Sequence, residues 1–437
     1  MNRSSWSAHN VGKSARALLE RDAVVYLHQS GSTPCLSAIS RAHGIWLEDA
    51  DGRRYMDFHG NSCHHVGYGH PRLIAAMKQQ LDELPFTPRR FTDEPAVELA
   101  EKLSSLWPGS PGRVLLATGG SDAVEIALKL ARFATGRYKT LSFYDSYHGS
   151  GFGAISVGGR ESDRPARLGP LLPGALHVPP FYRRPNSTSA LPVDDESWAR
   201  TCLQALEENF AREPDIAAVI AEPIRSTPHV PPQWFWPQVR QLCDRYGTLL
   251  IFDEIATGLG KTGKLFVSEH FAVVPDITVI GKALGGALVP IAAAIANPAL
   301  DVAPELRAGH YTHEKNPLTA RAALTTLQII EDEALVERAA GGGIRALTLL
   351  EQIAATQPLI RAVRGRGLLM AVELVENMAE SVMYRALTKG LSLSATEGRH
   401  LTLSPPLVIA DEEMDGALSV LEQALVEEQS ASNKRAQ

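Results

Sequence analysis

The sequence predicts an α/β protein built mainly on a parallel β-sheet with helices on both faces, together with a smaller α+β lobe. Three observations support this fold class: short apolar runs recur along the chain, helical stretches separate several of them, and a glycine-rich turn joins one run to a helix. Short buried strands that alternate with helices are typical of a mostly parallel sheet. The five runs are Val114–Ala117, Thr140–Phe143, Ala217–Ala221, Thr248–Phe252 and Ile277–Ile280.

Local signals predict a hairpin and four helices. An Asp-Gly turn at residues 51–52 separates two alternating runs, which indicates a hairpin that extends to Phe58. Helical periodicity, with proline at several of the starts, predicts helices over residues 71–84, 95–106, 123–134 and 317–333.

The remaining segments are less regular. Residues 1–22 are polar and predict an arm or a short helix, and residues 433–437 predict a polar tail. Residues 161–196 are rich in proline and arginine, which predicts a long surface excursion. Residues 365–374 form an apolar run that predicts one strand of the C-terminal lobe.

Composition excludes several classes of protein. The 437 residues carry a formal charge of −6 without a strongly basic block, which argues against nucleic acid as a partner. No apolar stretch is long enough to span a membrane, and the N-terminal segment lacks the apolar core of a secretion signal. The four cysteines are scattered, so we expect no metal site, no disulfide framework and a cytoplasmic location.

Lys282 and Asp253 are the residues that indicate the chemistry. Lys282 lies in a glycine-rich turn that follows one predicted strand, and Asp253 ends another. Ligands of open α/β sheets gather at the carboxyl ends of strands, so both side chains are expected in one cavity. An aldehyde cofactor with a pyridine ring needs an amine to form a Schiff base and an acid to keep its ring nitrogen protonated. The pair therefore predicts pyridoxal phosphate.

Gly119, Gly120 and Ser121 lie between a predicted strand and a helix. Exposed N–H groups at a helix N-terminus bind phosphate, so these residues are candidates for the cofactor phosphate. The alternative is a tight turn in which Ser121 caps the helix. Glu222 ends another strand; it is expected either near the 3-hydroxyl of the ring or as a support for neighbouring loops.

Tyr147 and His148 follow a further predicted strand. An aromatic face against the pyridine would hold the ring flat and exclude water, although Tyr147 as an ordinary half-buried aromatic residue fits the sequence nearly as well. His148 is expected to be structural, without an acid–base role.

Across nearly its whole length the chain resembles the class III aminotransferases, which are fold-type I pyridoxal-phosphate enzymes. The matching motifs are Gly119–Ala123, Tyr147–Gly149, Glu222–Pro223, Asp253–Gly258, Pro275–Asp276, Gly281–Gly286 and Thr312 ahead of Asn316–Pro317. The resemblance implies that Lys282 carries the cofactor and that Asp253 bonds its ring nitrogen. It further implies cofactor contacts for the following residues: Gly120, Ser121, Tyr147, Glu222, Ile255 and Thr312.

The same resemblance implies a domain organisation and an assembly. A large cofactor-binding domain with a mostly parallel seven-stranded sheet is expected over residues 66–315. Residues 1–65 would supply an N-terminal arm and part of a small α+β domain, which residues 316–437 complete through a connecting helix. Thr312 would reach the phosphate of a neighbouring subunit, which implies a homodimer with shared active sites, or a tetramer of two such dimers.

Three features depart from the aminotransferase pattern. Arg225 stands where many members have glutamine, and Thr402 stands where members specific for amino acids have an arginine that binds the α-carboxylate. Arg399 lies close enough in sequence to be a candidate replacement. Arg89 and Arg90 add two cations near the expected substrate entrance. Guanidinium groups suit phosphonate or phosphate oxygens, so Arg225, Arg89 and Arg90 are candidate substrate contacts; the alternative is that they are surface charges.

Further motifs resemble the class III-related lyases that act on (R)-1-hydroxy-2-aminoethylphosphonate. They are Phe58–Asn61, Tyr68–Pro71, Leu84–Thr92, Glu222–Arg225 and Gly309–Pro317. This resemblance implies a small amino-phosphonate as substrate, with ammonia and phosphonoacetaldehyde as products. Two alternatives are an ω-amine aminotransferase that uses pyruvate or 2-oxoglutarate, and a cofactor-bound scaffold without turnover, against which the intact Lys282 and Asp253 argue.

Overall fold

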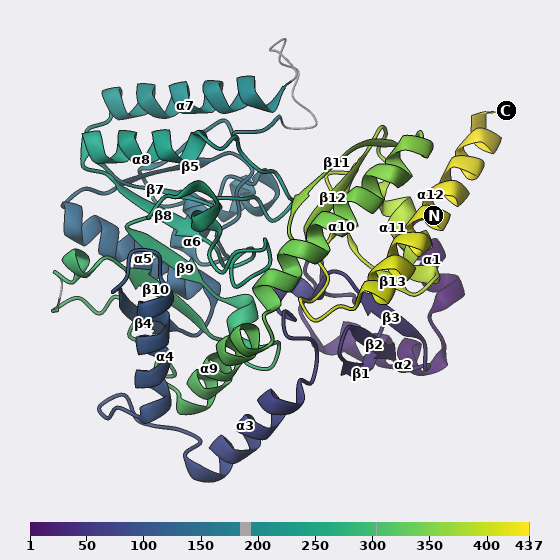
Figure 1. The fold of residues 1–437 in the computed structure, drawn as a ribbon, viewed down its shortest axis with the longest axis horizontal. Coiled ribbons are helices and arrows are strands. Elements are labelled where there is room, and N and C mark those ends of the chain that lie inside the picture. Colours follow the sequence, from purple (N-terminus) through teal and green to yellow (C-terminus); the bar gives the residue numbers. More distant parts are fainter. Residues whose placement is uncertain (184–193, 303, 437) are drawn as a thin grey trace. The chain divides into compact units, whose positions relative to one another are not determined.

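The computed structural model describes residues 1–183, 194–302 and 304–436. The chain forms two compact units (Figure 1). The sheet unit contains residues 71–260 and 264–333, and the terminal unit contains residues 1–70, 261–263 and 334–437. Within the described ranges, no helix combines the length and the apolar composition needed to cross a membrane.

The sheet unit is built on seven strands in the order β4-β10-β9-β8-β7-β5-β6. The strands are β4 Arg113–Ala117, β5 Lys139–Phe143, β6 Ala175–Val178, β7 Ile216–Ala221, β8 Leu249–Asp253, β9 Ile277–Ile280 and β10 Ala292–Ala296. Strand β10 is antiparallel to both of its neighbours, whereas β9, β8, β7, β5 and β6 pair in parallel. The predicted α/β class with a mostly parallel sheet is confirmed.

Helix α5 packs across the middle of this sheet because small residues on both elements permit a close approach. Its buried alanines and Val124 contact alanine and isoleucine side chains of β7, β8 and β10. Figure 1 shows α7 and α8 side by side, and α8 packs against strand β8. The helices of this unit are α3 Pro71–Glu83, α4 Glu94–Leu106, α5 Gly120–Thr135, α6 Phe152–Val157, α7 Asp195–Arg212, α8 Phe235–Tyr246 and α9 Pro317–Asp332.

Two strands of this sheet were not predicted. Strand β10 is four-fifths alanine, a residue with low strand propensity, and its pairing with β4 and β9 outweighs that preference. Strand β6 lies inside residues 161–196, where only a surface excursion was predicted, and it becomes an edge strand by pairing with β5. Residues 184–193 of that predicted excursion lie outside the described residues. Helix α9 groups with the sheet unit, whereas the predicted division placed it with residues 316–437.

The terminal unit contains two four-stranded sheets, in the orders β1-β2-β3-β13 and β11-β12-β15-β14. The strands are β1 Ile39–His43, β2 Trp46–Asp49, β3 Arg54–Asp57, β11 Ile360–Arg366, β12 Leu369–Leu374, β13 Leu391–Ser392, β14 Ser394–Thr396 and β15 His400–Leu403. The helices are α1 Arg3–Asn10, α2 Lys13–Val25, α10 Leu335–Thr356, α11 Ala379–Thr388 and α12 Asp411–Ala436.

The hairpin predicted up to Phe58 is present as the antiparallel pair β2 and β3. The polar N-terminal segment forms two helices, and α1 buries Trp6 against Tyr384 of α11. The strand predicted over residues 365–374 is present as β12 but begins only at Leu369, because Gly367 adopts a φ of 56° and turns the chain between the antiparallel strands β11 and β12.

Lys261 in the terminal unit should make stability depend on pH. Its ammonium group is fully buried and donates a hydrogen bond to the Pro405 carbonyl, and burial lowers the pKa of Lys261 to about 7 despite the nearby Asp57. The pKa of an unfolded lysine is about 10.4, so between pH 7 and this value the unfolded state binds one proton more than the folded state. We expect unfolding free energy to rise from pH 7 towards pH 10 by up to about 1.4 kcal/mol per pH unit.

The measurement is denaturant unfolding of the wild type and of Lys261→Met at several pH values between 6 and 10. The difference between the two proteins isolates this group from the other titrating side chains. Parallel pH profiles for the two proteins would show that Lys261 keeps its proton in the folded state.

Candidate active site

A small cavity in the sheet unit collects most of the residues predicted to hold the cofactor. Its volume is about 170 Å³. The lining residues are Gly120, Ser121, Tyr147, His148, Gly149, Glu222, Ser226, Asp253, Ile255, Ala256 and Lys282. Seven of the predicted cofactor contacts therefore meet here. Thr312, Arg89, Arg90 and Arg225 are not part of the described lining.

The sheet topology explains this convergence. Glu222 directly follows β7, Asp253 ends β8, and Lys282 comes two residues after β9. These strands are adjacent and parallel, so their carboxyl ends lie at the same edge of the sheet. Three ionisable side chains that are far apart in sequence are thereby delivered to one place.

Lys282 sits in a strained turn. Its φ of 44° lies in the left-handed region, which is costly for a residue with a Cβ atom. The residue opens the 3₁₀ helix Lys282–Gly285, against which α9 packs. Among the described residues, no hydrogen bond or ion pair holds the Lys282 amine, so this amine is available for a ligand. Strain of this kind concentrates at functional sites.

Asp253 is buried and held from two directions. Its Oδ2 accepts a hydrogen bond from His148 Nδ1 at 2.8 Å, and its Oδ1 accepts one from the Ile255 backbone N–H at 3.1 Å. A carboxylate has about four acceptor positions, so capacity for a ring N–H remains. His148 thus contacts the predicted partner of the ring nitrogen, a contact that sequence analysis missed. The Tyr-His-Gly motif after β5 was the available signal.

The N-terminus of α5 forms the end of the cavity with open backbone donors. Gly119 is the N-cap and makes no side-chain capping bond, while Ser121 Oγ accepts a hydrogen bond from the Ser150 N–H instead of capping the helix. The first N–H groups of a helix have no intrahelical partner, so they remain available for an anion. A side chain at Gly149 would collide with Ser121 Oγ, at 2.4 Å, so this approach requires glycine.

Arg225 lies next to Glu222 in a closed, buried network. Its guanidinium donates to Glu222 Oε2, to the Asp145 carbonyl, and to the Tyr182 hydroxyl at 3.2 Å. Burial alone would raise the pKa of Glu222, but the charge of Arg225, with that of His148 and Lys282, lowers this pKa below its ordinary value. The result is an ionised carboxylate at the cavity wall.

Tyr147 and Ile255 provide apolar surface. The Tyr147 side chain is partly exposed, and its hydroxyl shares a hydrogen bond of 3.1 Å with Ser150 Oγ. Ile255 lies beside Gly120, where an added Cβ would be 3.0 Å from Ile255 Cδ1. Both residues line the cavity from different elements, as stacking and floor residues for a planar ring would.

The other predicted contacts lie on exposed parts of the sheet unit. Thr312, Arg89 and Arg90 are exposed, and Arg89 donates from Nη1 to the His310 carbonyl at 3.3 Å. In the terminal unit, Thr402 is buried in β15, and its hydroxyl has no hydrogen-bond partner among the described residues. Arg399 donates from Nε to Asn377 at 3.0 Å.

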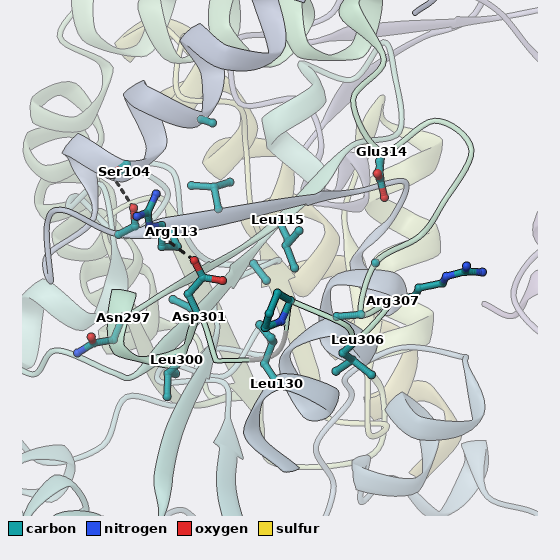
Figure 2. A pocket seen from close by; sticks show the side chains of 18 of the residues that line it. Ser104, Arg113, Leu115, Leu130, Asn297, Leu300, Asp301, Leu306, Arg307 and Glu314 are labelled. Atoms are coloured by element: carbon teal, nitrogen blue, oxygen red, sulfur yellow. Dashed lines mark hydrogen bonds and ion pairs between the residues drawn. The ribbon is translucent and has the colours of Figure 1, made fainter. Parts of the chain in front are cut away.

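A larger cavity of about 790 Å³ lies elsewhere in the sheet unit, around β4, β10 and residues 304–310. Figure 2 shows Arg113 and Asp301 directed towards one another at its wall, where their charged atoms are 4.0 Å apart. This cavity contains neither the lysine nor the carboxylates described above. Although this cavity is the larger of the two, it is therefore not the candidate active site.

Comparisons with known proteins agree with this geometry. The profile of the family Aminotransferase class-III matches residues 27–425. The chain belongs to the class-III aminotransferase family. An amine transaminase of an uncultivated Pseudomonas species, whose crystal structure is in the pyridoxal-phosphate-bound form, superposes with a TM-score of 0.85 at 31% identity, covering 92% of this chain and 98% of that one. The cofactor of this class-III enzyme is therefore pyridoxal 5'-phosphate.

Two relatives of known name differ in reaction type. The (R)-1-hydroxy-2-aminoethylphosphonate ammonia-lyase of Vibrio splendidus is 41% identical over 97% of this chain and 92% of its own length. The 5-aminovalerate aminotransferase DavT of Pseudomonas aeruginosa is 34% identical over 87% of this chain and 91% of its own length. The family thus includes both lyases and aminotransferases close to this chain.

The residues present fit pyridoxal phosphate. The open N–H groups at the start of α5 suit its phosphate, Asp253 suits its ring nitrogen, and the unpaired amine of Lys282 suits its aldehyde. Gly120 and Gly149 provide the close approach that a bulky phosphate needs. The cavity also joins an acid, an amine and an aromatic ring in one place, as this cofactor requires.

Proposed function

We propose that this class-III enzyme is a pyridoxal-phosphate-dependent ammonia-lyase that converts (R)-1-hydroxy-2-aminoethylphosphonate into phosphonoacetaldehyde and ammonia. The observation that carries the proposal is the 41% identity, over almost the whole chain, to a relative named for this reaction. The buried Thr402 supports it, because a threonine cannot form the bidentate contact by which an arginine holds an α-carboxylate.

Each residue of the cavity would have a separate role in this reaction. When bound, pyridoxal phosphate supplies an electron-withdrawing ring that makes a proton on the carbon next to the amine acidic. The Lys282 amine removes that proton, and Asp253 keeps the ring nitrogen protonated throughout. Glu222, held by Arg225, and Tyr147 would contact the ring of the cofactor, and Tyr147 would also exclude water from it.

The overall reaction balances without a second substrate. The carbon next to the amine loses a proton and the neighbouring carbon loses its hydroxyl, so one water leaves the substrate. The resulting enamine takes up a proton on carbon to become an imine. Water then adds to the imine, and ammonia and the aldehyde separate. No keto acid and no oxidant enter the balance.

This balance separates the lyase from an aminotransferase. We expect the holoenzyme, incubated with (R)-1-hydroxy-2-aminoethylphosphonate and without keto acid, to release ammonia and aldehyde in equal amounts over many turnovers. The assay measures both products, with 5-aminovalerate plus 2-oxoglutarate or pyruvate as the comparison. Product that accumulates only with a keto acid, and appears as its amino acid, would instead identify an aminotransferase.

The assembly and location remain part of the proposal. Thr312 is exposed and outside the cavity of its own chain, which suits a contact with the cofactor phosphate of a neighbouring subunit in a homodimer. Scattered cysteines without the spacing of a disulfide framework suit the cytoplasm. The exposed Arg89 and Arg90 stay candidates for attracting an anionic substrate.

A further inference from the structure

The proposed substrate carries a phosphonate that needs a cation, and the buried Arg225 is poorly placed to supply it. Its guanidinium contacts the Glu222 carboxylate, and a second carboxylate is close, with Asp145 Oδ2 at 3.6 Å from Nη2 of Arg225. A phosphonate brought to this guanidinium would meet two carboxylates and would have to displace bonds that are already made. Removing one partner from a buried ion pair is costly. Arg225 is therefore better suited to positioning Glu222.

Arg160 offers a cation next to the cavity wall. Its guanidinium carbon lies 5.1 Å from the ring centroid of Tyr147, which lines the cavity. The ion pair between Arg160 and Asp163 is long at 3.5 Å, and the Arg160 side chain is 39% exposed. An exposed, loosely held ion pair contributes little, so an anion with two charges can compete for this guanidinium.

The backbone fixes Arg160 relative to the loop that carries Tyr147. The N–H groups of Gly159 and Arg160 both donate to the Ser146 carbonyl, at 2.9 and 3.2 Å. A side chain at Gly159 would overlap the Phe143 carbonyl, at 2.1 Å, so these two segments pack backbone to backbone. The backbone of Arg160 is thus fixed next to the loop that carries Tyr147.

We propose that Arg160 binds the phosphonate of the substrate and so determines specificity for amino-phosphonates. This inference rests on the proposed function for its substrate class, but its contact can be tested without turnover. Guanidinium groups match the oxygens of phosphonates through paired N–H donors. The stacking of Arg160 on Tyr147 restricts the guanidinium, which reduces the entropy lost on binding.

The test compares ligand binding to the holoenzymes of the wild type, Arg160→Gln and Arg160→Lys. The ligands are 2-aminoethylphosphonate, which lacks the leaving hydroxyl, and propylamine, which lacks the anion. Dissociation constants come from the change in cofactor absorbance. Arg200→Gln is the matched control, because Arg200 also lies over an aromatic ring, Trp234, at 5.0 Å and pairs with a nearby carboxylate.

We expect Arg160→Gln to raise the dissociation constant of 2-aminoethylphosphonate by about tenfold to a hundredfold. The dissociation constant of propylamine should change by no more than about twofold. Arg160→Lys should fall between the wild type and Arg160→Gln, and Arg200→Gln should match the wild type. Three outcomes would each overturn the assignment. They are an equal loss of affinity for both amines in Arg160→Gln, an unchanged affinity for 2-aminoethylphosphonate in that variant, and the absence of 2-aminoethylphosphonate binding by the wild type.

The two proposals can fail separately. Selective weakening by Arg160→Gln in an enzyme that releases no ammonia would support Arg160 and reject the lyase. Ammonia release with no effect of Arg160→Gln on phosphonate binding would support the lyase and reject Arg160.

Discussion

Replacing Lys282 with alanine is expected to remove covalent cofactor attachment and to lower turnover by about 10³-fold or more, since the residue also moves the proton. Its amine lines the cavity in a turn whose left-handed φ of 44° an alanine can occupy at similar cost, so the fold should survive. The measurements are the visible absorbance of the lysine-bound cofactor and the initial rate of ammonia release.

Lys264→Ala is the matched control for this variant. Lys264 is exposed in the same unit and does not line the cavity, so its replacement should leave both absorbance and rate unchanged. Small alkylamines added to Lys282→Ala should restore part of the rate, because they replace the missing proton carrier. An unaltered cofactor spectrum in Lys282→Ala would refute the assignment of this lysine.

Replacing Asp253 with asparagine is expected to lower turnover by about 10²-fold while the cofactor stays bound through Lys282. The neutral amide cannot stabilise a positive charge on the ring nitrogen, so the ring withdraws electrons less strongly when the proton is removed. Asparagine has nearly the same volume as aspartate, and the Ile255 N–H can still donate a hydrogen bond to the amide oxygen. Steady-state rates and bound cofactor, measured on the same samples, separate turnover from loss of cofactor.

Two further variants make this interpretation specific. His148→Phe removes the 2.8 Å bond to Asp253 but keeps the carboxylate, so it should depress the rate less than Asp253→Asn and shift the pH dependence of the cofactor spectrum. Asp244→Asn affects an ion pair with Arg240 in which the Asp244 side chain is 64% exposed, and it should change neither quantity. Full activity in Asp253→Asn would be incompatible with a role for its charge.

The order of strand-end motifs made much of the site predictable. Glu222, Asp253 and Lys282 each follow a short apolar run, and parallel neighbouring strands bring such positions together whatever the surrounding loops do. The central strands and the helix that begins at Gly120 were predictable for the same reason, since burial on both faces leaves a continuous apolar pattern. The central strands, the residues that follow them and the start of this helix are each specified by residues that are close together in the sequence.

Other features depended on partners that are distant in sequence. Strand β10 forms from alanines because β4 and β9 lie on either side of it. Arg225 is enclosed because Asp145, eighty residues earlier, accepts a hydrogen bond from its guanidinium. His148 contacts Asp253, which is 105 residues later in the sequence. Arg160 lies beside Tyr147 because the Ser146 carbonyl accepts hydrogen bonds from the N–H groups of Gly159 and Arg160.

The amino-acid sequence by itself indicated the α/β class from its alternating apolar runs and helices, and the cofactor from short motifs at strand ends. The same motifs predict the lysine and the aspartate that we propose to serve this cofactor. Only the tertiary structure decided which charges are already neutralised by neighbours and which remain available to a ligand. Sequence shows that a residue is an arginine, but the free energy of its charge depends on burial and on the groups within a few ångströms. Arg225 and Arg160 carry the same side chain, and their surroundings give them different roles.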